Sequence, residues 1–248
     1  MIDAYPAFPI LVGILTAFLI AGMVKGSLGI GFPAVAMPIL LTIIEPALGV
    51  TLLAIPIFVT NGIQFLTVRG WPAIISRFLV AGLSVAVTIF IVVQFVDDVP
   101  SRWISIAIGV SLVIFALASL LKIELPFNEG YGWQAFIGIT AGLIGGVSAV
   151  KAPIMIYTVG LKLPREEFIC AAGFLLFAGG VGMVAGTFSA SLLNGVTTVL
   201  SLACCAVALA GFRIGAWIRQ RLSDRMFRLI LLWVLLAMGV RLILTNLF

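Results

Sequence analysis

Histidine is absent from this 248-residue chain, and charged residues make up only 9% of it. The absence of histidine excludes a histidine general base and the commonest side-chain ligand of protein-bound metals. The three cysteines, Cys170, Cys204 and Cys205, all lie inside apolar runs and show no metal-ligand spacing, so a disulfide framework is not expected either. We therefore expect no catalytic residue, no metal and no cofactor.

Acidic residues are also scarce, and none lies in the middle of an apolar run. Proton-coupled carriers often use a carboxylate at that depth as a relay. The sequence offers none, and so leaves the coupling ion open between H⁺ and Na⁺. The nine acidic residues fall in terminal stretches or between apolar runs: Asp3, Glu45, Asp97, Asp98, Glu124, Glu129, Glu166, Glu167 and Asp224.

Apolar residues dominate what is present. They make up 63% of the chain and raise its mean hydropathy to +1.31. A soluble domain would have about 25% charged residues. Short segments of alternating polarity, typical of an outer-membrane barrel, are missing. The sequence therefore predicts an all-α, polytopic membrane protein in a single membrane domain. Its net charge of +5 reflects loop placement and does not indicate nucleic acid. The N-terminus lacks the basic region of a signal peptide, so we expect the first apolar run to be retained.

Ten apolar segments can be distinguished. A full membrane span needs about 20 residues, and six segments meet that length. The other four are short, and they pair around two glycine-rich stretches. Each pair therefore predicts either two half-helices or a hairpin that dips into the bilayer. The segments are 8–24, 30–44, 47–68, 73–96, 102–121, 133–147, 149–160, 167–188, 192–212 and 226–247.

The two halves of the chain resemble each other. Gly31–Pro38 matches Gly146–Pro153 at an offset of 115, which would place Lys151 opposite Ala36 and Lys25 opposite Thr140. We interpret this as a duplication, with repeat 1 at about 8–121, repeat 2 at about 133–247 and a linker at about 122–132.

Loop charges predict that the repeats are inverted. Arg69 and Arg77 mark one link of the first half as cytoplasmic, whereas the corresponding link of the second half, 189–194, is uncharged. The next link of the second half carries a cluster of arginines. The linker 122–132 would then be cytoplasmic and both termini would face outward. Inverted repeats with discontinuous helices are a recurrent transporter design, in which the substrate binds near the midplane.

Lysine stands beside glycine and proline in both glycine-rich stretches, Lys25–Pro33 and Gly142–Pro153. A cation inside a membrane segment is costly, and it indicates a functional site by default. Turns at Gly26–Pro33 and Gly145–Pro153 would expose backbone amides and helix N-termini, which favour anions. We therefore expect a binding site for a small anion. Its candidate residues are Lys25, Gly26, Ser27, Gly29, Gly31, Asn61, Gln64, Gly145, Gly146, Ser148 and Lys151.

Structural roles compete for the same residues. Glycine in membrane helices usually serves packing, and Gly138-x-x-x-Gly142 fits a helix contact face. Lys25 would snorkel to the interface if its segment ended early. Asn61 and Gln64, one helical turn apart, would either line the cavity or hydrogen-bond between helices.

With these residues in view, the chain resembles the sulfite exporter TauE/SafE family over essentially its full length. The resemblance rests on Gly22-x-x-x-Gly26-x-x-Gly29-x-Gly31 with Pro38, on Gly138-x-x-x-Gly142-x-x-Gly145-Gly146 with Ala152–Tyr157, and on the loop Gly160–Phe168. Lys151 and its neighbours depart from the family pattern, which commonly has glycine or proline there. The family is usually described with about eight spans.

The resemblance implies transport of sulfite, sulfoacetate or a similar sulfonate across the bacterial inner membrane. We therefore expect a multi-pass secondary transporter in which one repeat rocks against the other. An anion channel, or a carrier for a non-sulfur carboxylate, is the alternative. The expected partners are a small anionic substrate and the lipid bilayer, and the sequence leaves homo-oligomerisation open.

Overall fold

The computed structural model describes residues 6–29, 31–67, 71–121, 126–219 and 224–247. Arg69, Arg221 and the first part of the linker, 122–125, lie outside these ranges. The described residues form ten α-helices and no strand. They are α1 (Phe8–Leu28), α2 (Phe32–Leu40), α3 (Pro46–Leu66), α4 (Trp71–Val93), α5 (Ser101–Leu120), α6 (Tyr131–Ser148), α7 (Ala152–Gly160), α8 (Arg165–Ser189), α9 (Gly195–Arg219) and α10 (Asp224–Leu247).

Seven of the described helices are long and apolar enough to cross a membrane, which confirms the predicted polytopic α-helical class. They are α1, α3, α4, α5, α8, α9 and α10. The prediction of a short first segment, 8–24, was wrong, because α1 continues to Leu28 and reaches 21 residues. Its helix runs on through Lys25, Gly26 and Ser27, since glycine and serine are tolerated wherever a neighbouring helix packs closely against them.

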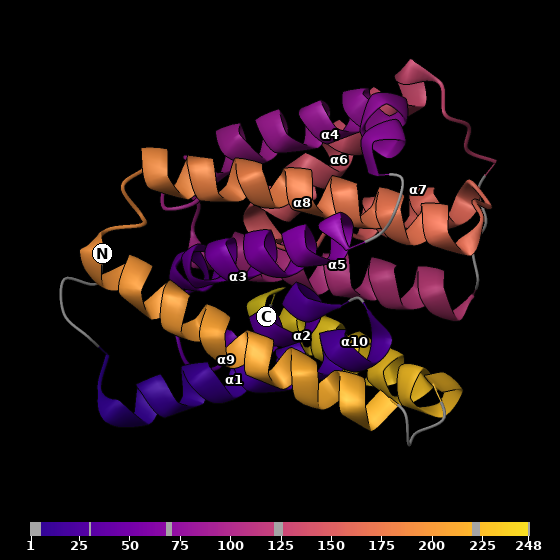
Figure 1. Ribbon diagram of the computed structural model, residues 1–248. Coiled ribbons are helices and arrows are strands. Elements are labelled where there is room, and N and C mark those ends of the chain that lie inside the picture. The colour runs from indigo at the N-terminus through magenta and orange to yellow at the C-terminus, as the bar shows by residue number, and fades with distance from the viewer. Residues whose placement is uncertain (1–5, 30, 68–70, 122–125, 220–223, 248) are drawn as a thin grey trace.

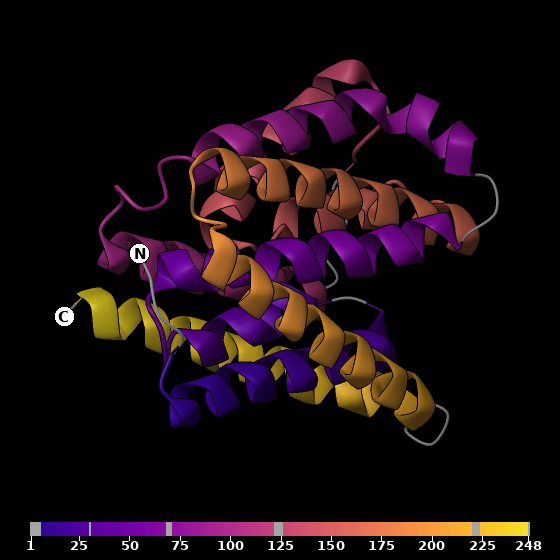
Figure 2. The same ribbon diagram turned by 60° about the vertical axis from the view of Figure 1, so that its left-hand side comes forward.

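Two short helices, α2 and α7, turn back alongside the helices that precede them. Figure 1 shows α1 and α3 starting at one end of the bundle, whereas α6 and α8 start at the opposite end. Between the starts of α1 and α3, and between the starts of α6 and α8, the chain therefore runs into the bundle along one helix and returns along a nine-residue helix, α2 or α7. Each hairpin thus returns toward the end from which it entered, and the two hairpins enter from opposite ends. Figure 2 places the start of α1 and the end of α10 at the same end.

Left-handed residues break the helix in both hairpins. Gly29 (φ 79°) ends α1 and donates its N–H to the carbonyl of Lys25, and Gly31 (φ 91°) precedes α2. In the second hairpin Ala149 (φ 61°) ends α6 in the same way, on the carbonyl of Gly145. A proline then follows at the second position of each half-helix, where its missing N–H costs nothing. The predicted turns, Gly26–Pro33 and Gly145–Pro153, were too long, because only the residues from Gly29 and Ala149 onward leave the helix.

The packing exchanges one helix between the two halves of the chain. α9, from the second half, packs against α1 and α3, and α4, from the first half, packs against α6 and α8. Eight of the described helices thus form a lower bundle (α1, α2, α3 and α9) and an upper bundle (α4, α6, α7 and α8), which meet where α3 contacts α8 (Figure 1), and the other two, α5 and α10, pack mainly against each other. Whole repeats are not separate packing units. The expectation that one repeat rocks against the other stays a prediction, and α4 and α9 pack each repeat against the other.

Glycines make the helix contacts inside each bundle. In the lower bundle a Cβ on Gly22 or Gly26 would lie 2.3 or 2.0 Å from a backbone oxygen of α9. In the upper bundle a Cβ on Gly138 or Gly142 would meet a side-chain Cβ of α4, at 2.5 or 2.4 Å. Backbones approach this closely only where no side chain intervenes. The pattern Gly138-x-x-x-Gly142 is thus a helix contact face.

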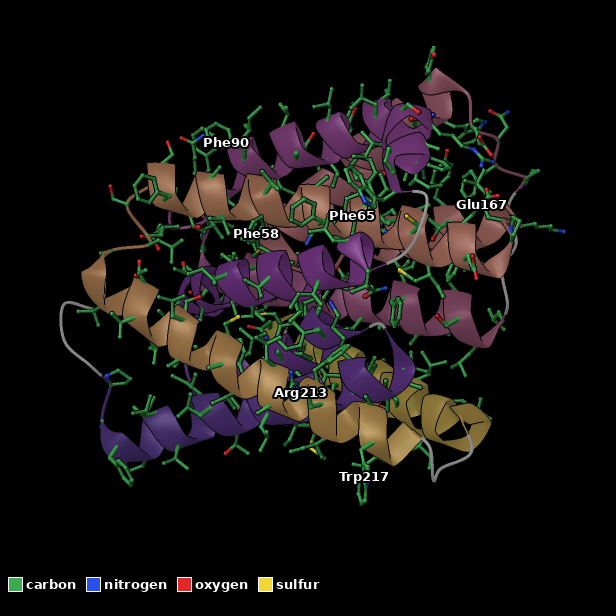
Figure 3. The ribbon with its side chains drawn as sticks, in the orientation of Figure 1. Phe58, Phe65, Phe90, Glu167, Arg213 and Trp217 are labelled. Carbon is green, nitrogen blue, oxygen red and sulfur yellow. The ribbon has the colours of Figure 1, made fainter. Side chains whose placement is uncertain are left out.

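Aromatic rings fill the contact between the two bundles. Phe58 and Phe65 of α3 stack on Phe177 of α8, with ring centroids 5.1 and 6.0 Å apart (Figure 3). Such ring pairs add about 0.5–1.5 kcal/mol beyond the burial of their area. The α3–α8 contact is therefore closed by large side chains in this conformation.

Candidate functional site

Lys25 is buried inside the lower bundle, with only 3% of its surface exposed. It lies in the last turn of α1, and its Nζ donates hydrogen bonds to Oγ1 of Thr60 (3.0 Å) and to Oδ1 of Asn61, both on α3. Thr60 in turn donates to the carbonyl of Pro56. Both acceptors of the ammonium group are neutral. Lys25 therefore does not snorkel to an interface, and its charge has no counter-ion among these contacts.

Lys151 is the N-cap residue of α7 and is 4% exposed. Its side chain makes no hydrogen bond or ion pair with any described residue. The aliphatic stem lies against two glycines, since a Cβ on Gly145 would meet its Cγ at 2.8 Å and one on Gly179 would meet its Cε at 2.6 Å. Both glycines therefore make room for the lysine. An unpaired ammonium group inside a protein is strongly unfavourable unless an anion or water compensates it.

Both lysines border one cavity, of about 40 Å³, between the two bundles. A volume of that size holds a few water molecules and no organic ligand. Among the described residues no acidic side chain lines it, and apart from the lysines only Asn61 contributes a polar side chain. The lining residues are Lys25, Gly29, Gly31, Phe32, Pro33, Ala34, Ile57, Asn61, Phe115, Val150, Lys151, Ala152, Met155 and Leu176.

The two helix breaks correspond at an offset of 120, not the predicted 115. Gly29 matches Ala149 as the left-handed cap, and the nine-residue helices 32–40 and 152–160 match throughout. In this register Lys25 corresponds to Gly145, and Gly31 corresponds to Lys151. Each hairpin thus has one lysine and one glycine at these two positions, in opposite order. The predicted register failed because Gly/Pro composition aligns apolar segments without fixing the residues at which the backbone turns.

Five of the predicted site residues line the cavity: Lys25, Gly29, Gly31, Asn61 and Lys151. Gly145 lies beneath the stem of Lys151. Of the other five, four have structural contacts elsewhere, and Gln64 lies outside the cavity lining.

Four of these others are held by helix packing or by local hydrogen bonds. Gly26 packs against α9, and Gly146 packs against Val92 of α4. Ser27 donates to backbone carbonyls of its own helix, and Ser148 accepts the N–H of Val150.

Gln64 does not line the cavity, although it lies only three residues after Asn61 on α3. It is half-buried, whereas Asn61 is 4% exposed. Helical spacing placed the two on one side of α3, but the cavity covers only the part of that side next to Lys25.

Sequence reasoning missed the apolar wall, which includes Phe115, Met155 and Leu176. Nothing in their local sequence distinguishes them from lipid-facing residues.

Pro56 was a sequence signal for a contact between α3 and another helix. It lacks an N–H, so the carbonyl of Leu52 has no partner within α3, and Ser201 of α9 donates to it at 2.9 Å. A proline inside a membrane helix marks a place where neighbouring side chains satisfy the backbone.

Arg77 organises a polar cluster at the end of the bundle where α6 and α8 start. Its guanidinium group forms ion pairs with Glu129 of the linker and with Glu167 of α8, which Figure 3 labels. The hydrogen bonds from Arg77 lower the pKa of the Glu129 carboxyl. The cluster joins α4 to the start of the second half and lies apart from the lysine cavity.

Gln134 completes this cluster across a kink in α4, at Phe78 (φ −114°, ψ 20°). Its side chain accepts the N–H of Ala81 and donates to the carbonyl of Arg77. These are the two groups that an unbroken helix would join directly. The glutamine therefore stabilises the kink.

A larger hollow, of about 570 Å³, opens beside the α2–α3 connection. Glu45 and Asp97 line it, together with Thr42, Thr51 and Thr197. Two carboxylates, with no basic side chain among the described lining residues, make it unsuited to an anion. Within the described residues no group of three His, Cys, Asp or Glu side chains could hold a metal ion.

Comparison with known proteins identifies the family. The family model described as sulfite exporter TauE/SafE matches residues 14–242, which include both hairpins and both lysines. No curated protein and no solved structure matches the chain. Seven apolar helices agree with a multi-pass membrane transporter. The chain therefore belongs to the sulfite exporter TauE/SafE family.

Proposed function

We propose that this protein is a secondary transporter that moves a small sulfur-containing or organic anion, such as sulfite or sulfoacetate, across the bacterial inner membrane. The observation that carries the proposal is the unpartnered ammonium group of Lys151, 4% exposed, on the same cavity as Lys25. A structural role would be expected to provide a counter-ion or a set of acceptors for it. A substrate anion supplies that counter-ion.

The site binds its anion between the two bundles. Lys25 and Asn61 belong to the lower bundle, whereas Lys151 and Leu176 belong to the upper one. A cavity of about 40 Å³ is far smaller than the roughly 300–1,000 Å³ of ordinary ligand pockets. The bundles must therefore separate to admit the substrate, and the present conformation is closed around the cavity.

Alternating access follows from the same arrangement. The α1–α2 hairpin enters from one end of the bundle and the α6–α7 hairpin from the other (Figure 1). Tilting the upper bundle against the lower one, about the α3–α8 contact, would open the cavity toward either end. The moving bodies in this proposal are the bundles, each with a helix from the other half of the chain.

Uptake by the purified protein in proteoliposomes tests this function. Lys151→Ala should raise the concentration for half-maximal transport by roughly tenfold or more, since a hydrogen bond to a charged group contributes about 1.5–3 kcal/mol. Lys162→Ala is the matched control, because Lys162 lies in the exposed loop after α7 and does not line the cavity. Saturable uptake with counterflow is expected. Unitary currents, or unchanged uptake of every transported anion by Lys151→Ala, would contradict the proposal.

A further inference from the structure

We infer that the site selects for an anion with two negative charges over one with a single charge. This inference rests on the function proposed above. It starts from the number of charges that the cavity leaves uncompensated. Lys25 and Lys151 are both more than nine-tenths buried and border the same cavity, and no carboxylate of the described residues lines it. A bound monoanion would therefore compensate only one of the two ammonium groups.

The second step concerns the surroundings of the two charges. Of the other lining residues only Asn61 has a polar side chain, and its Oδ1 already accepts from Lys25. Phe32, Ile57, Phe115 and Met155 form apolar walls. Such walls do not solvate a charge. In this low-dielectric surrounding an unpaired ammonium group is therefore costly, and its attraction to a bound anion is strong.

The third step is that neither lysine can easily leave. The stem of Lys151 lies between Gly145 and Gly179, and a Cβ on either would come within 3 Å of it. Lys25 is held by Thr60 and Asn61 on α3. Because both ammonium groups stay at the cavity, the ligand must supply two charges for full compensation.

The two lysines also differ in the hydrogen bonds that they must give up when an anion binds. Lys25 has two neutral acceptors, whereas Lys151 has none among the described residues. We therefore expect Lys151 to contribute more to affinity, since binding leaves no earlier hydrogen bond broken. Lys25 must exchange part of its contact with Asn61 for a contact with the anion.

Three two-carbon sulfonates separate charge from size. Sulfoacetate carries two negative charges at neutral pH, isethionate carries one, and taurine has no net charge. Dissociation constants are measured by titration of the purified protein in detergent at pH 7.5. We expect sulfoacetate to bind roughly ten- to hundredfold more tightly than isethionate, and taurine to bind most weakly.

Variants then assign the selectivity to the two lysines. Lys151→Met keeps most of the unbranched stem and removes the charge, and should reduce sulfoacetate affinity at least about tenfold with little change for isethionate. Lys25→Met should also reduce the preference. Lys162→Met, the control, should leave it intact. Thermal unfolding without ligand checks folding, and Lys151→Met should be at least as stable as the parent.

The outcomes distinguish the inference from the function on which it rests. Equal affinity of the parent protein for isethionate and sulfoacetate would overturn the inference and leave the transporter proposal standing. A preference for sulfoacetate that survives in both lysine variants would also overturn it. Failure of all three sulfonates, and of sulfite, to bind or be transported would overturn the proposed function itself.

Discussion

Replacing Asn61 by aspartate gives the protein an anion of its own at the cavity. The two side chains have nearly the same shape, and Oδ1 of Asn61 already accepts a hydrogen bond from Nζ of Lys25. In Asn61→Asp that contact becomes an ion pair. The variant should be more stable than the parent when empty, and should bind the substrate anion more weakly.

The expected size follows from the burial of Lys25. Two opposite charges about 3 Å apart attract by roughly 5 kcal/mol at an effective dielectric constant of about 20. Burying the new carboxylate costs several kcal/mol, but Lys25 is already desolvated in the parent. A net gain of about 1–3 kcal/mol remains, comparable to hydrogen bonds with charged groups. For a chain of this length each kcal/mol raises the Tm by roughly 2–4 °C.

Thermal unfolding and ligand titration in detergent measure both effects. Asn61→Asp should unfold several degrees higher without ligand, and should bind sulfoacetate roughly ten- to hundredfold more weakly than the parent. Gln64→Glu is the matched control. It adds a carboxylate to α3 three residues away, at a half-buried position that does not line the cavity. A destabilised Asn61→Asp protein that still binds the dianion with parental affinity would refute the proposed role of Lys25.

Two further predictions concern residues outside the cavity. Gly26→Ala should lower the free energy of unfolding by roughly 1–3 kcal/mol, because its Cβ would lie 2.0 Å from the carbonyl oxygen of Phe212. Gly195→Ala, which meets open space, should have little effect in the same unfolding assay, and equal stability of the two would contradict the close contact. Arg77 lowers the pKa of Glu129, so its stabilising effect is present above the unfolded pKa and is lost as the pH falls through the folded value. Glu129→Gln should therefore flatten the decline of Tm on the acid side, and a Tm-versus-pH curve parallel to that of the parent would count against the ion pair.

The sequence by itself determined the class of the protein. Solubility is a property of composition, so 63% apolar and 9% charged residues suffice to predict a membrane-embedded helical chain. Helix breaks are also local. Glycine at Gly29 and Gly31 permits positive φ, and a proline follows in each hairpin, so the two breaks could be located to within a few residues. The lysines beside these breaks could also be identified from the sequence, because they belong to the same local motifs.

Only the tertiary structure decided which residues face the cavity. Gly26 and Gly29 are three residues apart in one motif, yet the first packs against α9 and the second lines the cavity. In the same way, Asn61 lines the cavity whereas Gln64 does not. The exchange of α4 and α9 between the two halves could not be read from the sequence either. These features depend on which distant helix lies opposite a residue, and neither dihedral preference nor hydropathy contains that information.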